Sequence, residues 1–526
     1  MTQLSTALSA NVFVSSGKVW RWQLELIQAL ETSGSIKVCQ VISSDNTALI
    51  ANKSITLLHQ CDATIFRSPL DSFDVVNADL VLTSQSVVGA PNTIDILINL
   101  SESSLDPELL KEYKLGAIEA HFSEVGGLVS QELAIAEYLD KSSQIYISIV
   151  GFDSDGHTRI LSELRPSLDT GSLCRNLNQY FQLIEAVWLR VLNKVSDKKS
   201  STGLSNNSLD KDSELHTTSN VLSITDVPRL FQRFSGHVVD KLLQKYRQNE
   251  QWILLLQFRD KAGAEEIPLN FSEYIELVPP EDVFWADPFV VSEDGRHFVF
   301  FEELPFYTER GHLSCMEVFQ NGTYSSPKII LKQPYHLSFP NVFKHESTYY
   351  MIPETGDNGA IELYHSTEFP YQWERVHTLI DELNAYDSTL LEHDERWWLF
   401  ATVAAEKGMS GNEELHIFHA DSPISTEWQA HNANPVISDA STARPAGQFF
   451  KVGDDWFRPS QDCAGSYGAG LNINKVIKLD TNEYIEQRVQ TSRPDWKDNL
   501  TALHTLNFNN DVAVADALRV TSKGVF

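Results

Sequence analysis

The sequence has little cysteine, little positive charge and no long hydrophobic run. Its five cysteines are odd in number and scattered, and no pair has the CxxC spacing of a zinc site. We therefore expect buried free thiols in a reducing compartment, with no zinc site and no disulfide framework, and assign no metal ligand. Metal dependence stays open, because clustered carboxylates can hold Ca²⁺. With 41 Lys and Arg against 71 Asp and Glu, the formal net charge of −30 argues against broad binding to nucleic acid or to an anionic membrane. A local basic pocket for a phosphate or nucleotide stays open.

No apolar stretch approaches the ~20 residues of a membrane span. Residues 1–4 do not form a basic segment that leads into an apolar one, as a secretory signal would. We therefore expect no integral membrane segment and a cytoplasmic location. The 526 residues, 42% hydrophobic and 10% aromatic, predict two or three well-packed globular domains.

Residues 1–195 alternate between strand-like and helix-like patterns. Two stretches carry apolar residues at helical spacing, at 20–31 and 177–195. The strand-like stretches are short and lie at 11–16, 36–42, 78–82 and 94–100. This alternation predicts an α/β domain with a doubly wound parallel sheet.

One segment of this domain carries a motif. Residues 105–110 (LDPELL) and 115–123 (LGAIEAHFS) resemble the formyltransferases that use tetrahydrofolate formyl donors, whose analogous segment holds a catalytic Asn and His. His121 matches that His, but Glu119 stands in the place of the Asn, and an ionised Glu cannot donate a hydrogen bond to a formyl oxyanion. The resemblance implies a formyltransferase-like fold. It leaves His121 as a candidate site residue for formyl transfer to an amino sugar, with a structural role as the alternative.

The chain changes character after residue 195. Residues 196–225 are rich in Ser, Asn, Asp, Lys and Thr and predict a flexible linker. Residues 226–283 predict a connecting helix and a buried strand. From residue 284 onward, short strands alternate with polar turns.

Five segments of the second half share one layout, in which a polar residue stands at the start of an apolar strand. Subtraction along the chain gives steps of 52, 48, 57 and 60 residues between the aligned positions Pro288, Pro340, Ser388, Pro445 and Thr505. Periods near 50 residues with an all-β pattern are typical of propeller blades. We predict a five-bladed β-propeller over residues 284–526, with an irregular β-sandwich as the alternative.

In a propeller the inner strands of all blades line one channel, so equivalent positions converge there. The position before each aligned residue is occupied by Asp287, Phe339, Asp387, Arg444 and His504. Other polar or aromatic candidates are Glu302, Glu303, Glu354, Gln461, Asp462, His336, Trp285, Tyr335, Tyr386 and Tyr467. Such a set suits carbohydrate chemistry, because glycosidic transfer needs one carboxylate as base or nucleophile and one protonated acid, and crowding raises one pKa. Each Asp can alternatively cap a turn.

Several motifs in order carry a resemblance. They are WADPF at 285–289, HLSFPNVF at 336–343, MIPE at 351–354, RP at 444–445 and QDC at 461–463. Together they look like the propeller domain of plant glucosamine inositolphosphorylceramide transferases, in which a separate glycosyltransferase domain follows the propeller. The propeller is also similar, more distantly, to the five-bladed arabinanase and fructosidase superfamily. That superfamily implies two Asp roles, which Asp287 and Asp387 fit, and an acid in blade four, where this chain has Arg444.

These observations predict a carbohydrate-active enzyme of cell-surface glycan or glycolipid biosynthesis that transfers a glycosyl group in the propeller channel. The expected substrate is a carbohydrate or a sugar nucleotide. Asp287 and Asp387 are the candidate catalytic residues, with Glu354 as candidate acid. The candidate substrate-binding residues are His336, Arg444, Gln461, Asp462, Tyr467, His504 and Trp285, of which Arg444 and His336 would hold a phosphate or carboxylate. The alternatives are a propeller glycoside hydrolase, an amino-sugar formyltransferase and a non-catalytic glycan-binding scaffold. No cofactor and no oligomeric state follow from the sequence.

Overall fold

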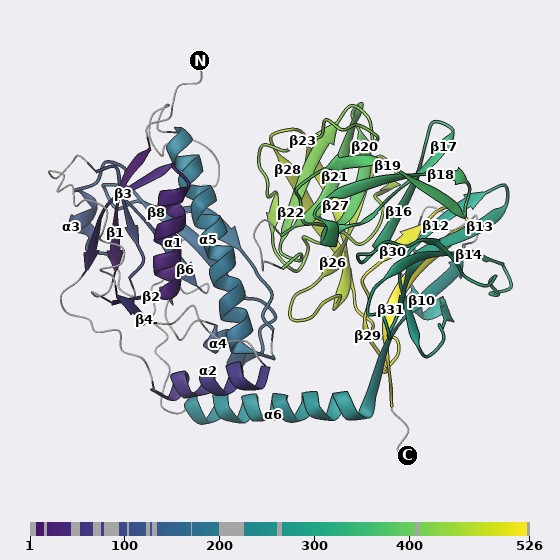
Figure 1. The fold of residues 1–526 in the computed structure, drawn as a ribbon, viewed down its shortest axis with the longest axis horizontal. Helices are drawn as coiled ribbons and strands as arrows, with labels where there is room; N and C mark the ends of the chain where they lie inside the picture. Colours follow the sequence, from purple (N-terminus) through teal and green to yellow (C-terminus); the bar gives the residue numbers. More distant parts are fainter. Residues whose placement is uncertain are drawn as a thin grey trace. The chain divides into compact units, whose positions relative to one another are not determined.

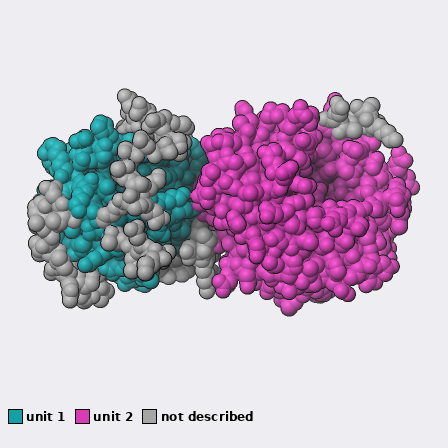
Figure 2. Space-filling view, turned by 90° about the horizontal axis from the view of Figure 1, so that it is seen from above, with its two compact units in different colours: residues 1–238 teal, residues 239–526 magenta. Residues whose placement is uncertain are grey.

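The computed structural model divides into two compact units, residues 1–238 and 239–526, which Figure 2 colours separately. It describes residues 7–14, 18–43, 53–66, 75–77, 94–101, 105–122, 127–128, 134–169, 171–198, 226–259, 266–404 and 410–522. No helix in these ranges is long and apolar enough to cross a membrane. The strand predicted at 78–82, and residues 199–225 of the predicted linker, lie outside the described residues.

Unit 1 contains one mixed sheet of strands in the order β3-β1-β5-β6-β8-β9, with β7 paired to β6. The strands are β1 (Leu8–Val14), β3 (Ile36–Ser43), β5 (Ile96–Asn99), β6 (Ala117–Phe122), β7 (Gly127–Leu128), β8 (Ile147–Phe152) and β9 (Thr158–Leu164). A separate pair joins β2 (Lys18–Trp20) to β4 (Val75–Asn77).

The sheet of unit 1 is parallel only in part. β1, β3, β5 and β6 pair in parallel, as predicted, but β8 runs antiparallel to β6 and β9 antiparallel to β8. The prediction of a wholly parallel sheet is therefore wrong. A short turn at residues 153–157 joins β8 to β9, and a turn of that length can only join antiparallel strands.

The helices of unit 1 include the two that the apolar spacing predicted. They are α1 (Arg21–Thr32), α2 (Lys53–Phe66), α3 (Pro107–Leu110), α4 (Ile135–Asp140) and α5 (Leu173–Lys198), and α6 (Asp226–Arg247) follows them. Figure 1 shows α1 beside α5, where Trp22 stacks on Phe181 at 5.0 Å between ring centroids. The α/β character is thus confirmed, whereas the formyltransferase-like fold stays a prediction.

Unit 2 is a five-bladed propeller, as its sequence repeats predicted. The first blade has β12 (Val283–Glu293), β13 (Arg296–Pro305), β14 (His312–Val318) and β15 (Lys328–Leu331). The second has β16 (Ser338–His345), β17 (Thr348–Glu354), β18 (Ile361–Glu368) and β19 (Gln372–Ile380). The third has β20 (Ala385–His393), β21 (Arg396–Val403), β22 (Glu414–Ala420), β23 (Gln429–Ala430) and β24 (Ile437–Ser438). The fourth has β25 (Phe450–Val452), β26 (Asp455–Asp462), β27 (Gly470–Leu479) and β28 (Tyr484–Ser492).

The fifth blade joins the two ends of the propeller. Its strands are β11 (Ile275–Leu277), β10 (Gln248–Phe258), β31 (Val512–Ser522), β29 (Leu500–Ala502) and β30 (Leu506–Phe508), and one-turn 3₁₀ helices lie at Phe271–Glu273 and Gly356–Asn358. All 11 residues of β10 pair with β31, far away in sequence but adjacent in Figure 1. Residues 226–283 were predicted only to connect the domains, yet they supply two strands of this blade, and their pairing with β31 covers the edges that both ends of the propeller would otherwise expose.

Polar side chains tie the inner strands of different blades together. The Asn341 side chain donates to the Ser388 carbonyl at 3.0 Å, and the Asn507 side chain donates to the Pro288 carbonyl at 2.8 Å. Gln448 donates to the Val342 carbonyl at 2.8 Å. The Ser388 and Pro288 carbonyls lie where the inner strands leave regular pairing, so these amides satisfy backbone groups that would otherwise be buried without partners.

The closure of the ring by β10 generates a prediction about stability. Leu256 of β10 is fully buried between the fifth and first blades, beside Val512 and Phe301. Leu256→Ala is expected to lower the free energy of unfolding of the propeller by about 2–5 kcal/mol. Calorimetry of the full chain measures this loss. The control Glu250→Ala changes an exposed position of the same strand and is expected to shift stability by no more than about 0.5 kcal/mol. Equal effects of the two substitutions would contradict closure through β10.

Candidate functional site

The inner strands of the first three blades share one backbone irregularity. In β12, β16 and β20 the pairing with the next strand skips two residues, which begin at Asp287, Phe339 and Asp387. These three residues have φ of 51°, 44° and 53°. Residues other than glycine adopt this left-handed region rarely, and such strain gathers at functional sites. The repeated bulge re-aims the side chain at each position that the sequence repeats aligned.

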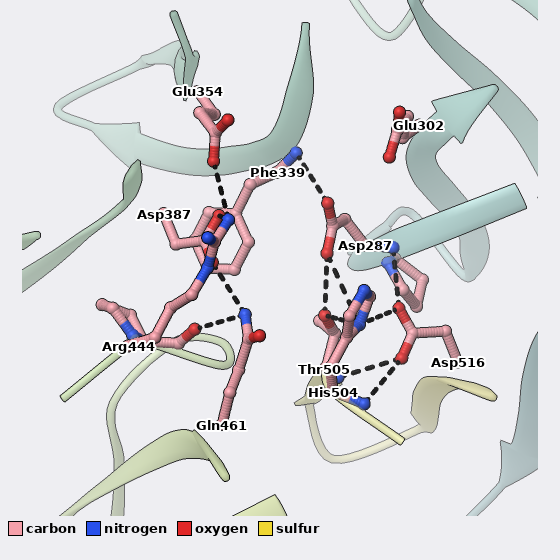
Figure 3. A network of polar contacts seen from close by, with 12 residues as sticks. Asp287, Glu302, Phe339, Glu354, Asp387, Arg444, Gln461, His504, Thr505 and Asp516 are labelled. Carbon is pink, nitrogen blue, oxygen red and sulfur yellow. Dashed lines mark hydrogen bonds and ion pairs between the residues drawn. The ribbon is translucent and has the colours of Figure 1, made fainter. Parts of the chain in front are cut away.

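Arg444 is the centre of one half of a polar network in the channel (Figure 3). Its Nε donates to Asp387 Oδ2 at 2.6 Å and its Nη2 donates to Glu354 Oε2 at 3.2 Å. Its Nη1 donates to Asn412 Oδ1 at 3.1 Å. Gln461 also donates to Asp387 Oδ2, at 2.7 Å. Four segments from three blades thus meet at one guanidinium, with Asp387 held by two donors.

The second half of the network is centred on His504. Its Nδ1 lies 2.7 Å from Asp516 Oδ2 and 3.8 Å from Asp287 Oδ1. Asp516 also accepts hydrogen bonds from the backbone N–H groups of Asp287, His504 and Thr505, at 2.9, 3.2 and 2.9 Å. Asp287 accepts from Thr505 Oγ1 at 2.9 Å and from the Phe339 N–H at 3.3 Å. Figure 3 shows this cluster beside the Arg444 cluster.

Each half contains two carboxyl groups and one cation. Arg444 binds Asp387 more closely than Glu354, and His504 binds Asp516 more closely than Asp287. The second carboxyl group of each half is therefore left with a weak counter-charge in a buried place, where the neutral form is favoured.

The pKa shifts follow this division. Burial, followed by the nearby Asp387 charge, raises the pKa of Glu354 well above its ordinary value. Burial likewise raises the pKa of Asp287 to about 7, against the opposing effect of His504. Burial alone would lower the pKa of His504, but the carboxylates of Asp516 and Asp287 outweigh it and raise that pKa to about 9. Near pH 7 Asp287 is thus partly protonated, and the raised pKa of Glu354 favours its neutral form as well.

Other predicted site residues lie at the edge of the network. Tyr467 is 43% exposed, and its ring lies 5.1 Å from the Arg444 guanidinium and 5.3 Å from the His504 ring. His336 accepts the Gly311 N–H at Nδ1, at 3.0 Å, and its Nε2 lies 3.2 Å from Glu302 Oε1. Tyr467 thus lies against both halves of the network, whereas His336 contacts Glu302.

Two predicted site residues lie outside the network. Trp285 is buried in the core between the fifth and first blades and packs on Phe301 at 5.2 Å. Asp462 forms an ion pair with Arg493 and caps the Ala464 N–H at 3.0 Å. Both residues stand in the predicted motifs, but a place in a motif does not fix which face of the strand carries the side chain.

The sequence reasoning missed Asp516, Thr505, Asn412 and Trp252, whose ring stacks on His504 at 4.0 Å. Trp252 was missed because its strand, β10, was predicted to be part of the connection between the two domains. Asp516 did leave a signal, since it is the one charged residue within the apolar run 512–518.

Asp287, His504 and Asp516 lie close enough to hold a metal ion. Their atoms, however, already bond to one another: Asp516 accepts three backbone N–H groups, and His504 Nδ1 points at its carboxylate. A metal would have to displace the proton of that imidazole. The donor set therefore fits an ion-paired cluster better than a metal site.

In unit 1, His121 belongs to a buried chain of side chains at the ends of β5 and β6. His121 Nε2 lies 2.6 Å from Glu119 Oε1, and Asn99 donates to Glu119 Oε2 at 2.8 Å. Asn99 is itself oriented by Ser101, whose hydroxyl donates to Asn99 Oδ1 at 2.7 Å. Glu119 thus acts as an acceptor for both neighbours and does not offer the donor that a formyl oxyanion needs.

The charge network generates a prediction about pH. His504 has a folded pKa of about 9, above the ~6.5 of an unfolded His, so its stabilisation is full below ~6.5 and is lost as the pH rises through about 9. The pKa of Asp287 is raised to about 7, so this group also lowers the stability of the fold as the pH rises from ~4 to 7. Above pH 7 we therefore expect a loss on the order of 3 kcal/mol from His504. Urea unfolding of the propeller at pH 6.5 and pH 9 measures it.

The variant His504→Gln should flatten this pH dependence, and the control His365→Gln, at a half-buried position of β18, should leave it as in the wild type. A slope unchanged in His504→Gln would show that other groups carry it.

Comparison with known proteins finds a match within the propeller. Residues 276–506 match the family model described as glucosamine inositolphosphorylceramide transferase 1, N-terminal. Glucosamine inositolphosphorylceramide transferase 1 of Oryza sativa subsp. japonica is 34% identical over 244 residues, which are 46% of this chain and 32% of that protein. The Arabidopsis thaliana protein of the same name is 29% identical over 256 residues, 46% of this chain and 33% of that protein. The chain thus matches about a third of the length of these relatives.

Solved structures also show some likeness. An exo-1,5-α-L-arabinanase from a bovine ruminal metagenomic library has 15% identity and a TM-score of 0.31, covering 46% of this chain and 94% of that chain. A Bombyx mori GH32 β-fructofuranosidase has 11% identity and a TM-score of 0.33, covering 46% of this chain and 61% of that chain. In sequence, the propeller is similar to the N-terminal region of glucosamine inositolphosphorylceramide transferases, as its motifs predicted.

Proposed function

We propose that the propeller channel binds a carbohydrate and takes part in glycosyl transfer during glycolipid biosynthesis. The observation that carries this proposal is the pair of carboxyl groups with raised pKa values, Glu354 and Asp287, in one buried network. Glycosyl chemistry uses two carboxyl groups as acid and base, and their surroundings set the pKa of each. The sequence similarity to glucosamine inositolphosphorylceramide transferases supports the same class of substrate.

In this proposal the three predicted carboxylates have different tasks. Asp287, half ionised near pH 7, can accept the proton of a sugar hydroxyl as that oxygen attacks the anomeric carbon. Glu354, whose raised pKa favours the neutral form, can donate a proton to the leaving oxygen of a glycoside, which departs as an alcohol when the bond to the anomeric carbon breaks. Asp387, held by Arg444 and Gln461, positions the guanidinium and does not offer a free oxygen for the proton.

A glycoside hydrolase would use the same acid and base with water as the acceptor, so hydrolysis is the second candidate. Formyl transfer by unit 1 is disfavoured by Glu119, which accepts hydrogen bonds where an oxyanion donor is required. A cytoplasmic location stays a prediction.

The test compares Asp287→Asn with Asp294→Asn. Both residues have positive φ, 51° and 52°, a conformation that Asn tolerates, so neither change should strain the backbone. Asp294 lies in the turn between β12 and β13, at the far end of the strand from Asp287. Each protein is assayed for binding on a glycan array and for turnover with sugar nucleotides and glycolipid acceptors.

Asp287→Asn is expected to lower turnover by about 10²–10⁴-fold, the contribution of a general base, while Asp294→Asn behaves as the wild type. Sugar binding without turnover in the wild type would support the non-catalytic scaffold. Unchanged binding and turnover in a folded Asp287→Asn variant would rule out the channel as the site.

A further inference from the structure

The cations of the channel network are engaged by protein groups. The Arg444 guanidinium donates to Asp387, Glu354 and Asn412, and the rings of Tyr386 and Tyr467 lie 5.3 and 5.1 Å from it. Its side chain is only 11% exposed. Such a guanidinium already has its carboxylate partners, so a phosphate would have to compete with two protein carboxyl groups for it.

His504 is engaged in the same way. Its Nδ1 faces Asp516 at 2.7 Å, its ring lies on Trp252 at 4.0 Å, and its side chain is 3% exposed. The imidazole of His336 is more open, with 30% exposure, but its Nε2 is directed at Glu302. Among the side chains of the network that the structure describes, the Arg444 and His504 cations thus each face a carboxylate of the protein.

In contrast to these cations, one carboxylate beside the network has an oxygen without a hydrogen-bond donor. Glu302 lies on β13 opposite Ala286, so it stands next to Asp287. Its side chain is 6% exposed, and its Oε1 is buried without a hydrogen-bond partner even though His336 Nε2 is 3.2 Å away. A buried carboxylate oxygen without a donor is costly, which points to a donor that arrives with a ligand.

The packing around Glu302 keeps that oxygen in place. A Cβ added at Gly311 would lie 2.4 Å from Glu302 Oε1 and 2.8 Å from the His336 ring, so only glycine fits there. The Gly311 N–H in turn holds His336 Nδ1 at 3.0 Å, which turns Nε2 toward Glu302. Three segments therefore fix one carboxylate at the edge of the channel.

Building on the carbohydrate site proposed above, we propose that the channel takes a neutral, hydroxyl-rich sugar, with Glu302 accepting a hydroxyl, and that the phosphate of a sugar nucleotide or lipid headgroup stays outside. A hydroxyl donates the hydrogen bond that Glu302 lacks. A phosphate brings only acceptors and negative charge into a site that already holds Asp287, Glu302 and Asp387. This proposal differs from the prediction that Arg444 and His336 hold a phosphate.

The experiment uses a substitution whose effect has opposite signs for the two ligand classes. Glu302→Gln removes one negative charge and keeps the shape of the side chain. For a neutral sugar it weakens a charge-assisted hydrogen bond, so affinity should fall by about tenfold. For a phosphate ligand it removes a repulsion, so affinity should rise. The control is Glu317→Gln, which changes an exposed ion pair with Arg296 in the same blade.

The probes are glucose, galactose, mannose, arabinose and N-acetylglucosamine as neutral sugars, with UDP-N-acetylglucosamine and inorganic pyrophosphate as phosphate ligands. Binding to the full chain is measured by calorimetry and by ligand-detected NMR at low and high salt. We expect a neutral sugar to bind with little salt dependence, to be unaffected by pyrophosphate, and to weaken in Glu302→Gln but not in Glu317→Gln.

The inference would be overturned if the sugar nucleotide bound in a salt-sensitive way, if pyrophosphate displaced it, and if Glu302→Gln strengthened its binding. That outcome would leave the proposed carbohydrate site standing. An equal affinity of wild type and Glu302→Gln for the neutral sugar would also overturn it. If no probe binds and Asp287→Asn has no effect on any glycan, the proposed function fails with it.

Discussion

One cation for every two carboxyl groups is the constraint on which the channel depends. Buried charges are tolerated only when they are paired. A second carboxylate beside a buried ion pair must therefore either take up a proton or find another cation. In the Arg444 half the proton goes to Glu354, and in the His504 half Asp287 takes it up to a pKa of about 7. The two titrating groups are therefore the carboxyl groups that lie farther from the cation of each half, and their chemistry follows from this shortage of positive charge.

The backbone is adapted to the same constraint. Asp516 is completely buried and accepts the N–H groups of Asp287, His504 and Thr505, so one carboxylate joins the fifth blade to the first. The bulge that puts Asp287 in a left-handed conformation also presents its N–H to Asp516. Ring closure, backbone strain and the position of the candidate base are thus coupled through a single side chain, because a buried carboxylate has to find its donors among whichever groups the fold brings near.

The sequence could predict those parts of the site that repeat. Asp287, Phe339 and Asp387 were aligned by spacing, and they share one bulge and one sign of φ. It could not predict the partner of Asp287, since Asp516 comes near only after β10 and β31 close the ring. Trp285 was drawn into the site by its place in a motif, although its ring fills the core between two blades. Local patterns set strands and turns, whereas the pairing of distant strands decides which polar groups meet.

Arg444, in blade four, has a physical consequence for the carboxyl groups of the neighbouring blades. A third carboxyl group there would leave Asp387 and Glu354 without a counter-charge, and both would have to be protonated or bound to a metal. Arg444 instead fixes Asp387 as its partner and leaves Glu354 as the group that keeps its proton. The carboxyl group that favours its neutral form therefore lies at the end of β17 in blade two. In the glycosyl transfer proposed above, the proton would reach a bound sugar from that side of the channel, so the position of Arg444 would decide which bond of the sugar can be activated.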